Sequence, residues 1–289
     1  MTPLRKKMIE EMQLRRFSEN TQESYVRSVT GLAGHYHISP DKITGDQLKN
    51  YVLFLANERK LKWSSINAII TGIRFFYSET LGRKDLALAI PPRKTPRYLP
   101  EIFSRGELIA LFSSTANLKH RTMLMTAYGC GLRVSEVISL KAASIDSSRM
   151  MVRICHGKGD KDRYTILSPR LLDQLRSYWR AYRPDPKGWL FENRSTKERL
   201  TRSTPQLVFK EAKKKAGIRK NVTFQSLRHS FSSHLLEAGV DIRTIQILLG
   251  HSSITTKARY LHVARKDLGS VKNPLDLLSV PDSKSLIRI

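Results

Sequence analysis

The sequence predicts a mainly α-helical protein with a small β-hairpin or sheet, an α+β fold in two parts. Three observations support this prediction. Apolar residues recur at helical spacing along most of the 289 residues, the spacing becomes that of strands between about 150 and 167, and a proline-rich stretch lies at 90–100. Four prolines there exclude a continuing helix and favour an extended path. We therefore expect a linker at 91–100 between two domains.

The part before the linker predicts about four helices in a compact bundle. The first covers residues 3–16, and each later helix follows a possible capping segment. These segments are Asn20 to Glu23, Thr44 with Gln47, and Ser64 or Ser65. The aromatic residues at 75–77 are better explained as core than as platforms for stacked bases.

The part after the linker predicts further helices interrupted by a hairpin. The strands are expected at Met150–Ile154 and Tyr164–Leu167, with a turn-rich segment between them. The tail, 268–289, is either a short helix docked on a neighbour or a frayed end. The helices are expected at 105–116, 118–129, 133–141, 169–182, 203–216, 226–238, 241–249 and 254–266.

The charge of the chain indicates a polyanionic partner. Lys and Arg number 51 against 25 Asp and Glu, which gives a formal net charge of +26, and both parts are basic. Because net charge reports on partners rather than on fold, nucleic acid is the leading candidate. The alternative is a merely basic protein that adheres to ribosomes or to lipid surfaces.

Composition also excludes several classes of protein. Apolar residues make up 40% of the chain, which is enough for a core, and two cysteines cannot build a disulfide framework. No apolar stretch is long enough for a membrane span, and no secretion signal begins the chain, so we expect a soluble protein in a reducing compartment. Phosphate-loop, HExxH and paired CxxC motifs are absent, His229 and His234 have poor spacing for a metal, and acidic residues are scattered. We therefore expect no metal and no cofactor.

Two candidate residues begin a predicted helix after a glycine-containing turn. Arg133 follows Gly129 to Leu132, and Glu136 lies one helical turn later. A guanidinium at a helix start opposes the helix dipole, so its position needs another reason. Binding of a phosphate is one such reason, with Glu136 orienting the arginine. The alternative is a surface ion pair between residues three apart.

Other candidates lie in the hairpin and near the end of the chain. Lys158 stands between two glycines at the hairpin tip, where it could reach a phosphate, although an exposed turn is the simpler explanation. In the segment 223–262, Leu235, Leu236, Val240, Ile245, Leu248 and Leu249 are expected to form a buried face. The polar exceptions are Arg228, His251 and Tyr260. Taken alone, this segment is compatible with a helix-turn-helix DNA reader, and Tyr260 with a core tyrosine.

Five motifs in order then point to a known family. GLRVSE, HGKGDKDR, LRHSFSSHLLEAG, IQILLGH and TTKARYLHV resemble the tyrosine recombinase, or phage integrase, family, and in particular the integrase-like recombinases of bacterial mobile elements. The resemblance implies a helical core-binding (SAM-like) DNA-binding domain at 1–90 and a catalytic domain at 101–267. It further implies a C-shaped clamp around duplex DNA and a synaptic tetramer, with the tail at 268–289 a candidate for docking in trans.

The resemblance also implies a role for each candidate residue. Arg133 and Arg228 match the two catalytic arginines, Lys158 the lysine of the hairpin, and His251 the histidine of the LLGH motif. Tyr260, nine residues after His251, matches the nucleophile. Glu136 matches the acidic residue that accompanies the first arginine. Gln225 stands where the family usually has a histidine; it can bind a phosphate oxygen but cannot shuttle a proton.

The function implied is site-specific DNA recombination in the bacterial cytoplasm, in association with the nucleoid. Strands are cleaved and rejoined through a covalent 3′-phosphotyrosyl intermediate, without metal or ATP. Integration, excision, transposition and resolution of chromosome dimers are all compatible with these motifs. One alternative is a DNA-binding protein of the same fold with weak or lost catalysis, for which Gln225 is the supporting feature. A metal-dependent nuclease would need an acidic cluster that the sequence does not offer.

Overall fold

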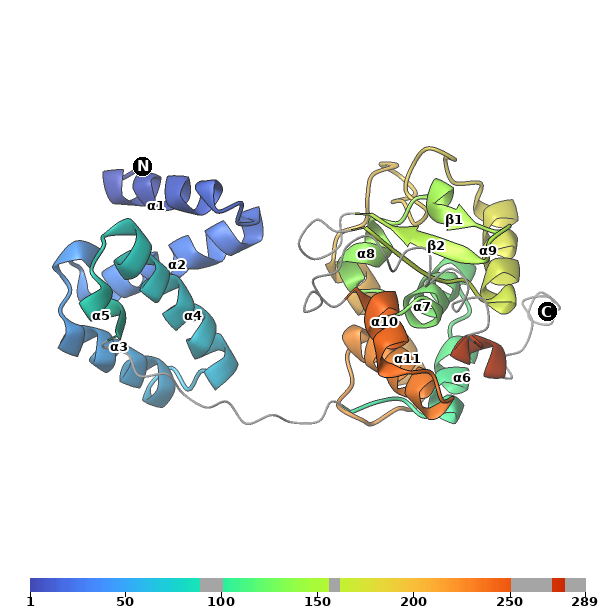
Figure 1. Ribbon diagram of the computed structural model, residues 1–289. Coiled ribbons are helices and arrows are strands. Elements are labelled where there is room, and N and C mark those ends of the chain that lie inside the picture. The colour runs from blue at the N-terminus through green and yellow to red at the C-terminus, as the bar shows by residue number, and fades with distance from the viewer. Residues whose placement is uncertain (89–100, 156–161, 251–271, 279–289) are drawn as a thin grey trace. The chain divides into compact units, whose positions relative to one another are not determined.

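The computed structural model describes residues 1–88, 101–155, 162–250 and 272–278. The chain divides into two compact units, Met1–Tyr98 and Leu99–Ile289, and this division falls within the predicted linker at 91–100. The described residues are mainly helical with a small sheet, as predicted (Figure 1). No described helix is long and apolar enough to cross a membrane.

The first unit is a helical bundle around its own core. Helices α2 and α4 pack most extensively against each other, and their buried faces include Leu32 and Ile66. Phe75, Phe76 and Tyr77 are buried in this core, as predicted. The elements are α1 (Pro3–Leu14), α2 (Glu19–Tyr36), the 3-10 turn η1 (Pro40–Lys42), α3 (Gly45–Asn57), α4 (Trp63–Phe75), the π-helical turn η2 (Phe76–Thr80) and α5 (Lys84–Leu88).

The helix starts of this unit test the predicted caps. Thr44 and Gln47 form the predicted capping box, with hydrogen bonds of 2.9 and 3.3 Å between each side chain and the other's backbone N–H. The prediction at Asn20 to Glu23 is wrong, because α2 begins earlier and Ser18 caps it. Ser64 and Ser65 are likewise not caps, since α4 begins at Trp63 after Lys62, which makes no side-chain cap. In both cases the helix starts before the best capping sequence.

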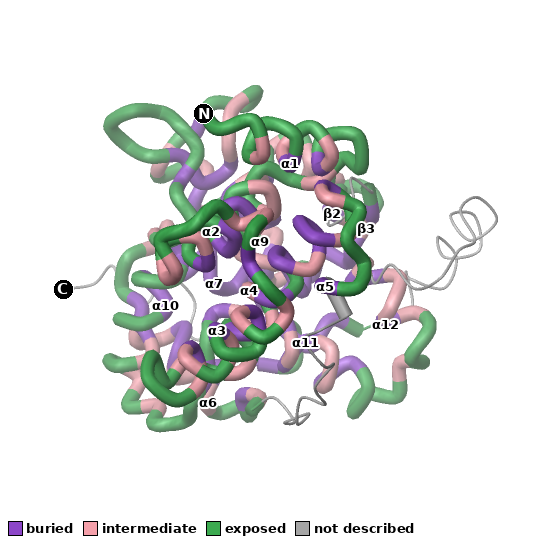
Figure 2. The backbone as a smooth tube through the Cα atoms, turned by 90° about the vertical axis from the view of Figure 1, so that its left-hand side faces the viewer, coloured by how far each residue is buried: buried purple, intermediate pink, exposed green. Residues whose placement is uncertain are grey.

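The second unit is built around helix α7 (Leu118–Gly129), which is buried at every residue from Arg121 to Gly129 (Figure 2). Within this unit, Figure 1 shows the sheet above α7 and helices α6, α10 and α11 below it. The other helices are α6 (Arg105–Ser113), α8 (Val134–Ile138), the 3-10 turn η3 (Ala142–Ser144), α9 (Pro169–Tyr182), α10 (Ser203–Lys215), α11 (Phe224–Glu237), α12 (Ile242–Leu249) and the 3-10 turn η4 (Pro274–Leu277).

The predicted hairpin is part of a three-stranded antiparallel sheet in the order β1-β2-β3. Strand β2 (Met151–Ile154) pairs with β3 (Arg163–Ile166) so that Ile154 faces Arg163. The short β1 (Ile145–Asp146) was not predicted, because two residues carry no readable alternation. Along β3, Arg163 and Thr165 share one face of the pleat and both are buried.

Three further predictions for the second unit can be compared with the structure. Helix α8 ends at Ile138 rather than 141. Leu236, expected on the buried face, is 53% exposed, whereas Leu235 is fully buried. The predicted helix at 254–266 lies outside the described residues.

The described part of the tail packs on its own chain. Asn273 donates a hydrogen bond of 2.8 Å from Nδ2 to the carbonyl oxygen of Gly129, and Leu275 is fully buried. Asp276 accepts a hydrogen bond of 3.3 Å from the backbone N–H of Arg170. Residues 272–278 therefore belong to the core of the second unit, and docking in trans stays a prediction for the segment 279–289, which lies outside the described residues.

Candidate active site

A tight turn after α7 presents Arg133. Gly131 has φ +60°, and a Cβ placed on it would lie 2.5 Å from Cδ1 of Phe231. Only glycine combines that backbone conformation with so close a neighbour. The chain then reaches Arg133, the residue that precedes α8, at a position fixed by the packing of α7 against α11.

Glu136 is the centre of the contacts made by Arg133. Its carboxylate accepts hydrogen bonds from the backbone N–H of Arg133, at 2.8 Å, and from Nη1 of the same residue, at 2.9 Å. The Glu136 side chain is only 4% exposed, whereas that of Arg133 is 24% exposed. In this pair the carboxylate is buried while the guanidinium is partly open to solvent, which differs from an ordinary surface ion pair.

Arg163 makes the closest pair with the same carboxylate. Its Nη1 and Nη2 donate to the two oxygens of Glu136, both at 2.8 Å, and its Nε donates to the carbonyl oxygen of Leu248 at 2.9 Å. Two parallel N–H···O bonds are the strongest arrangement of a guanidinium with a carboxylate. The first residue of β3 is thereby joined to α8 and to the end of α12.

Arg228 completes the cluster from α11. Its side chain is 3% exposed, and Nη1 donates to the carbonyl oxygen of Gly131 at 2.7 Å while lying 3.5 Å from Oε2 of Glu136. Its Nη2 donates to the carbonyl oxygen of Leu249. Within the described residues, three guanidiniums thus share one carboxylate. We call Arg133, Glu136, Arg163 and Arg228 the arginine cluster.

The electrostatics of the arginine cluster favour an added anion. Burial raises the pKa of Glu136, but hydrogen bonds and charge from Arg163, the backbone N–H of Arg133 and the charge of Arg228 outweigh it and lower that pKa to about 2. Burial, with the neighbouring charges of Arg133 and Arg163, lowers the pKa of Arg228 to about 9 despite the opposing effect of Glu136. Glu136 and Arg228 are therefore both charged at neutral pH, and the cluster holds three guanidiniums against one carboxylate.

Comparison with known proteins identifies the family. Residues 105–267 match the description "Phage integrase family", and residues 4–85 match "Phage integrase, N-terminal SAM-like domain". The chain belongs to the phage integrase family. It is a tyrosine-type site-specific recombinase, as the five motifs predicted.

Relatives and solved structures agree with this assignment. The recombinase is 45% identical to the "Putative integrase/recombinase y4qK" of Sinorhizobium fredii, over 97% of this chain and 91% of the relative. It is 37% identical to "Tyrosine recombinase XerA" of Pyrococcus horikoshii, over 74% of this chain and 75% of that protein. Its fold is similar to that of a lambda integrase tetramer bound to a Holliday junction, with a TM-score of 0.70 and 16% identity over 88% of this chain and 75% of the other.

The structure brings three of the predicted site residues of the recombinase together, namely Arg133, Glu136 and Arg228. Gln225 lies one turn before Arg228 on α11 and is half-buried, with no hydrogen bond to its side chain from the described residues. Lys158, His251 and Tyr260 lie outside the described residues. Their described neighbours along the chain are the ends of β2 and β3 for Lys158 and Gly250 for His251.

Arg163 is the member of the recombinase cluster that sequence reasoning missed. It is the last residue of the HGKGDKDR motif, one position before the predicted strand. Extending the alternation of that strand by one residue would have placed Arg163 on the buried face with Thr165. A buried arginine needs a partner, so this signal alone would have made it a candidate.

The histidines of α11 do not form a metal site. His234 is buried between Tyr128, whose hydroxyl lies 2.8 Å from Nδ1, and the carbonyl oxygen of Phe103, which lies 3.0 Å from Nε2. Burial also lowers the pKa of His234. Among the residues that the structure describes, no group of three or more His, Cys, Asp or Glu could hold a metal ion.

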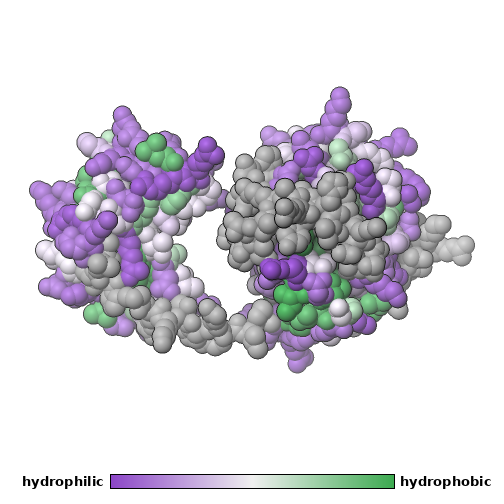
Figure 3. Space-filling model, viewed as in Figure 1, coloured by the Kyte–Doolittle hydropathy of each residue, from purple (hydrophilic) through white to green (hydrophobic). Residues whose placement is uncertain are grey.

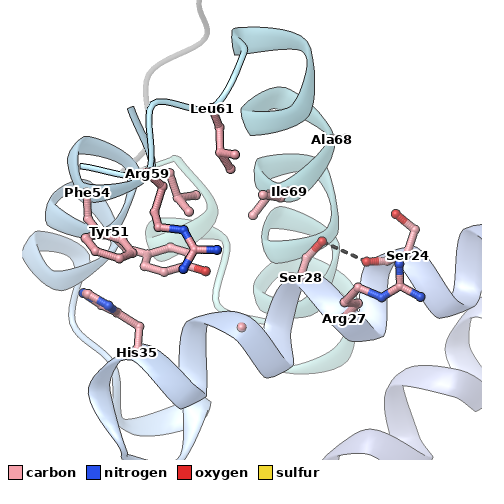
Figure 4. Close-up of a pocket in the computed structure, with 12 residues that line it drawn as sticks. Ser24, Arg27, Ser28, His35, Tyr51, Phe54, Arg59, Leu61, Ala68 and Ile69 are labelled. Atoms are coloured by element: carbon pink, nitrogen blue, oxygen red, sulfur yellow. Dashed lines mark hydrogen bonds between the residues drawn. The ribbon is translucent and has the colours of Figure 1, made fainter. Parts of the chain in front are cut away.

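The first unit carries a pocket of about 440 Å³ between α2, α3 and α4 (Figure 4). Its aromatic side is formed by His35, Tyr51 and Phe54, with ring centroids 4.2 Å apart for His35 and Phe54. Arg27 and Arg59 are exposed at this pocket, and neither guanidinium has an ion pair within the described residues. Hydrophilic side chains cover most of the viewed face of this unit (Figure 3).

Proposed function

We propose that this recombinase cleaves and rejoins duplex DNA through a covalent bond between Tyr260 and a 3′ phosphate. The observation that carries the proposal is the arginine cluster, in which three guanidiniums share one carboxylate and those of Arg163 and Arg228 also donate to backbone carbonyls. Such fixed donors stabilise the charge of a phosphoryl transition state because they need no reorganisation as that charge develops.

The chemistry is a transesterification in which the number of phosphate ester bonds is conserved. The Tyr260 oxygen attacks the scissile phosphorus, the bond from phosphorus to the 5′ oxygen breaks, and a 3′-phosphotyrosyl link forms. The tyrosine hydroxyl loses a proton and the 5′ oxygen gains one, for which Lys158 is the proposed donor. His251 is proposed to bind the phosphate or to assist Tyr260. Attack by the 5′ hydroxyl of a partner strand reverses the step, so ATP is not required.

Two residues are assigned supporting roles. Glu136 orients Arg133, in keeping with its hydrogen bonds to both the backbone and the side chain of that residue. Gln225 is proposed to bind a phosphate oxygen as an uncharged substitute for histidine, because its amide can donate a hydrogen bond but cannot transfer a proton.

Duplex DNA is the proposed partner, and both units hold it in a clamp. Four protomers are proposed to assemble on the DNA as a synaptic tetramer. The net charge of +26 and the exposed Arg27 and Arg59 support contacts to the phosphate backbone. The tetramer of lambda integrase on a Holliday junction supports the assembly. We place the protein in the bacterial cytoplasm at the nucleoid.

A covalent-trapping experiment tests the proposal. The recombinase carrying Tyr260→Phe is first used to select binding sites from a randomised duplex pool. Selected duplexes are then nicked next to each candidate scissile position, so that a short fragment diffuses away and religation fails. With EDTA present, the wild-type protein should form an adduct that survives SDS and dissolves with protease, and Tyr260→Phe should form none.

Controls separate the nucleophile from the fold. Tyr182→Phe removes one hydroxyl from a tyrosine that packs against Tyr178 in the second unit, and it should retain the adduct. An adduct that persists in Tyr260→Phe would overturn the assignment of the nucleophile. Sequence-specific binding without any wild-type adduct would instead favour the DNA-binding protein with lost catalysis, for which Gln225 is the supporting feature.

A further inference from the structure

Arg163 has no assigned role, yet its side chain joins three elements of the second unit. The guanidinium is 8% exposed and uses Nε, Nη1 and Nη2 as hydrogen-bond donors. Two of these bonds go to Glu136 in α8, and one goes to the carbonyl oxygen of Leu248 in α12. Arg163 itself begins β3, opposite Ile154 of β2.

The contacts of Arg163 determine how closely Glu136 can pair with Arg133 and Arg228. Because Arg163 occupies both carboxylate oxygens at 2.8 Å, Arg133 makes a single side-chain bond to Glu136 and Arg228 stays 3.5 Å away. Without Arg163, the buried carboxylate would attract these two guanidiniums into closer pairs. The N–H donors and the positive charge of Arg133 and Arg228 would then turn toward Glu136 and away from the side of the cluster where a phosphate would bind.

Arg163 also fixes the end of α12. Its Cδ would lie 2.7 Å from a Cβ placed on Gly250, a residue with φ +64°, so the side chain packs directly against that backbone. Arg163 binds the carbonyl oxygen of Leu248 and Arg228 binds that of Leu249. Two guanidiniums therefore donate to consecutive carbonyls at the point where the chain leaves α12. Carbonyls at the end of a helix have no hydrogen-bond donor within the helix, so these guanidiniums supply the missing donors.

We infer that Arg163 is a positioning residue of the recombinase, which holds Glu136 and the end of α12 so that Arg133 and Arg228 are set for the scissile phosphate. This inference rests on the proposed function. Arg163 acts through the other two arginines and does not contact the DNA. A lysine could not replace it, because an ammonium group lacks the planar fork that binds a carboxylate and a carbonyl together.

The test compares Arg163→Lys with Arg153→Lys, the same change on the neighbouring strand. Arg153 is exposed and pairs with Asp162 at 2.8 Å, so it is a matched control. Single-turnover cleavage of the trapped duplex should slow by roughly tenfold to a hundredfold in Arg163→Lys, since small misplacements of catalytic groups have effects of this size. Binding of the duplex should change by less than about threefold, and Arg153→Lys should cleave at the wild-type rate.

A neutral scissile group distinguishes positioning from general damage to the fold. In a duplex with a methylphosphonate at the scissile position, the arginines have no anionic oxygen pair to neutralise. The deficit of Arg163→Lys should therefore shrink severalfold on this substrate, whereas a merely structural defect would slow both substrates equally. The inference would be overturned if Arg163→Lys slowed cleavage of both substrates equally, or if it cleaved the ordinary duplex at the wild-type rate.

Two further measures keep the outcome decisive. If thermal melting shows that Arg163→Lys is unfolded at the assay temperature, the double variant Arg163→Met with Glu136→Gln replaces it, because it leaves no buried carboxylate unpaired. The double variant is also expected to show a smaller deficit on the methylphosphonate duplex than on the ordinary duplex. Equal deficits on the two substrates would overturn the inference. Failure of the wild-type protein to form an adduct would count against the proposed function, while an active wild type beside an unimpaired Arg163 variant would count against this inference alone.

Discussion

Two pairs of arginines, one in each unit of this recombinase, have opposite surroundings. In the first unit, Arg27 and Arg59 are exposed beside a pocket and have no ion pair within the described residues. In the second unit, Arg163 and Arg228 are buried, and each donates to Glu136 and to at least one backbone carbonyl oxygen. Exposed arginines can follow a phosphate backbone with little order of their own, whereas buried ones are fixed before any DNA arrives.

This difference has an energetic cause. An exposed guanidinium keeps its hydration and is screened by salt, so it contributes affinity that depends on ionic strength. A buried guanidinium loses hydration, and at Arg163 and Arg228 one carboxylate and several carbonyls compensate for that loss. The cost of burying these charges is offset by Glu136, whose own pKa of about 2 reflects the same contacts.

The largest expected effect comes from Arg228→Lys. The lysine keeps the charge but cannot bind the carbonyl oxygens of Gly131 and Leu249 together. We expect single-turnover cleavage to fall by about a hundredfold or more, as for the loss of a fixed donor at a transition-state anion, with duplex affinity nearly unchanged. Arg176→Lys, at an exposed pair with Asp173, is the matched control. Equal losses of binding and cleavage would show that Arg228 behaves like a surface arginine.

The next effect concerns stability and its dependence on pH. Lowering the pKa of Glu136 from 4.5 to about 2 corresponds to about 3 kcal/mol, which Glu136→Gln should remove at pH 7 in urea unfolding. Because the folded pKa is depressed, this contribution is complete above the unfolded pKa and is lost as pH falls through about 2. The stability difference between wild type and variant should therefore shrink between about pH 4.5 and 2.

An exposed acid provides the control for Glu136. Glu10→Gln removes a surface partner 3.9 Å from Lys6 and should change the free energy of unfolding by less than about 1 kcal/mol. A pH-independent difference for Glu136→Gln would contradict the charge-based account of the arginine cluster.

A smaller effect is expected at the pocket of the first unit. Arg27→Ala and Arg59→Ala should each weaken duplex binding modestly and reduce the slope of log affinity against log salt by about one, since each is proposed to neutralise one phosphate. Fluorescence anisotropy at several salt concentrations measures this slope. Lys49→Ala, which breaks a surface pair with Asp46 at 3.0 Å, should leave the slope nearer to that of the wild type. An unchanged slope in both arginine variants would remove the pocket from the DNA contacts.

The smallest effect is local to the start of α3. Thr44→Ala removes the side-chain acceptor of the capping box and should lower the free energy of unfolding of the first unit by about 1 kcal/mol. Thr71→Ala, in the interior of α4, removes a hydroxyl that donates to the carbonyl oxygen of Asn67 and should cost less. Equal losses would mean that the cap is not what begins this helix.

The sequence by itself predicted the elements whose signals are local. Apolar spacing predicted most of the described helices, though not the short α5, and β-type residues around a turn predicted the hairpin at β2 and β3, because these patterns depend on neighbours within a few residues. The capping box of Thr44 and Gln47 is equally local and was confirmed. The ordered motifs likewise led to the family and to Arg133, Glu136 and Arg228.

The tertiary structure alone decided where helix α2 begins and which charged side chains pair with one another. Packing of Phe17 against Tyr25 and Phe75 accompanies the earlier start of α2, so Ser18 became the cap instead of the segment at Asn20. Arg163 lies 27 residues from Glu136 and 85 from Leu248, and only folding brings them within hydrogen-bond distance. Local sequence can indicate that an arginine is buried, but the partners that make its burial stable come from distant parts of the chain.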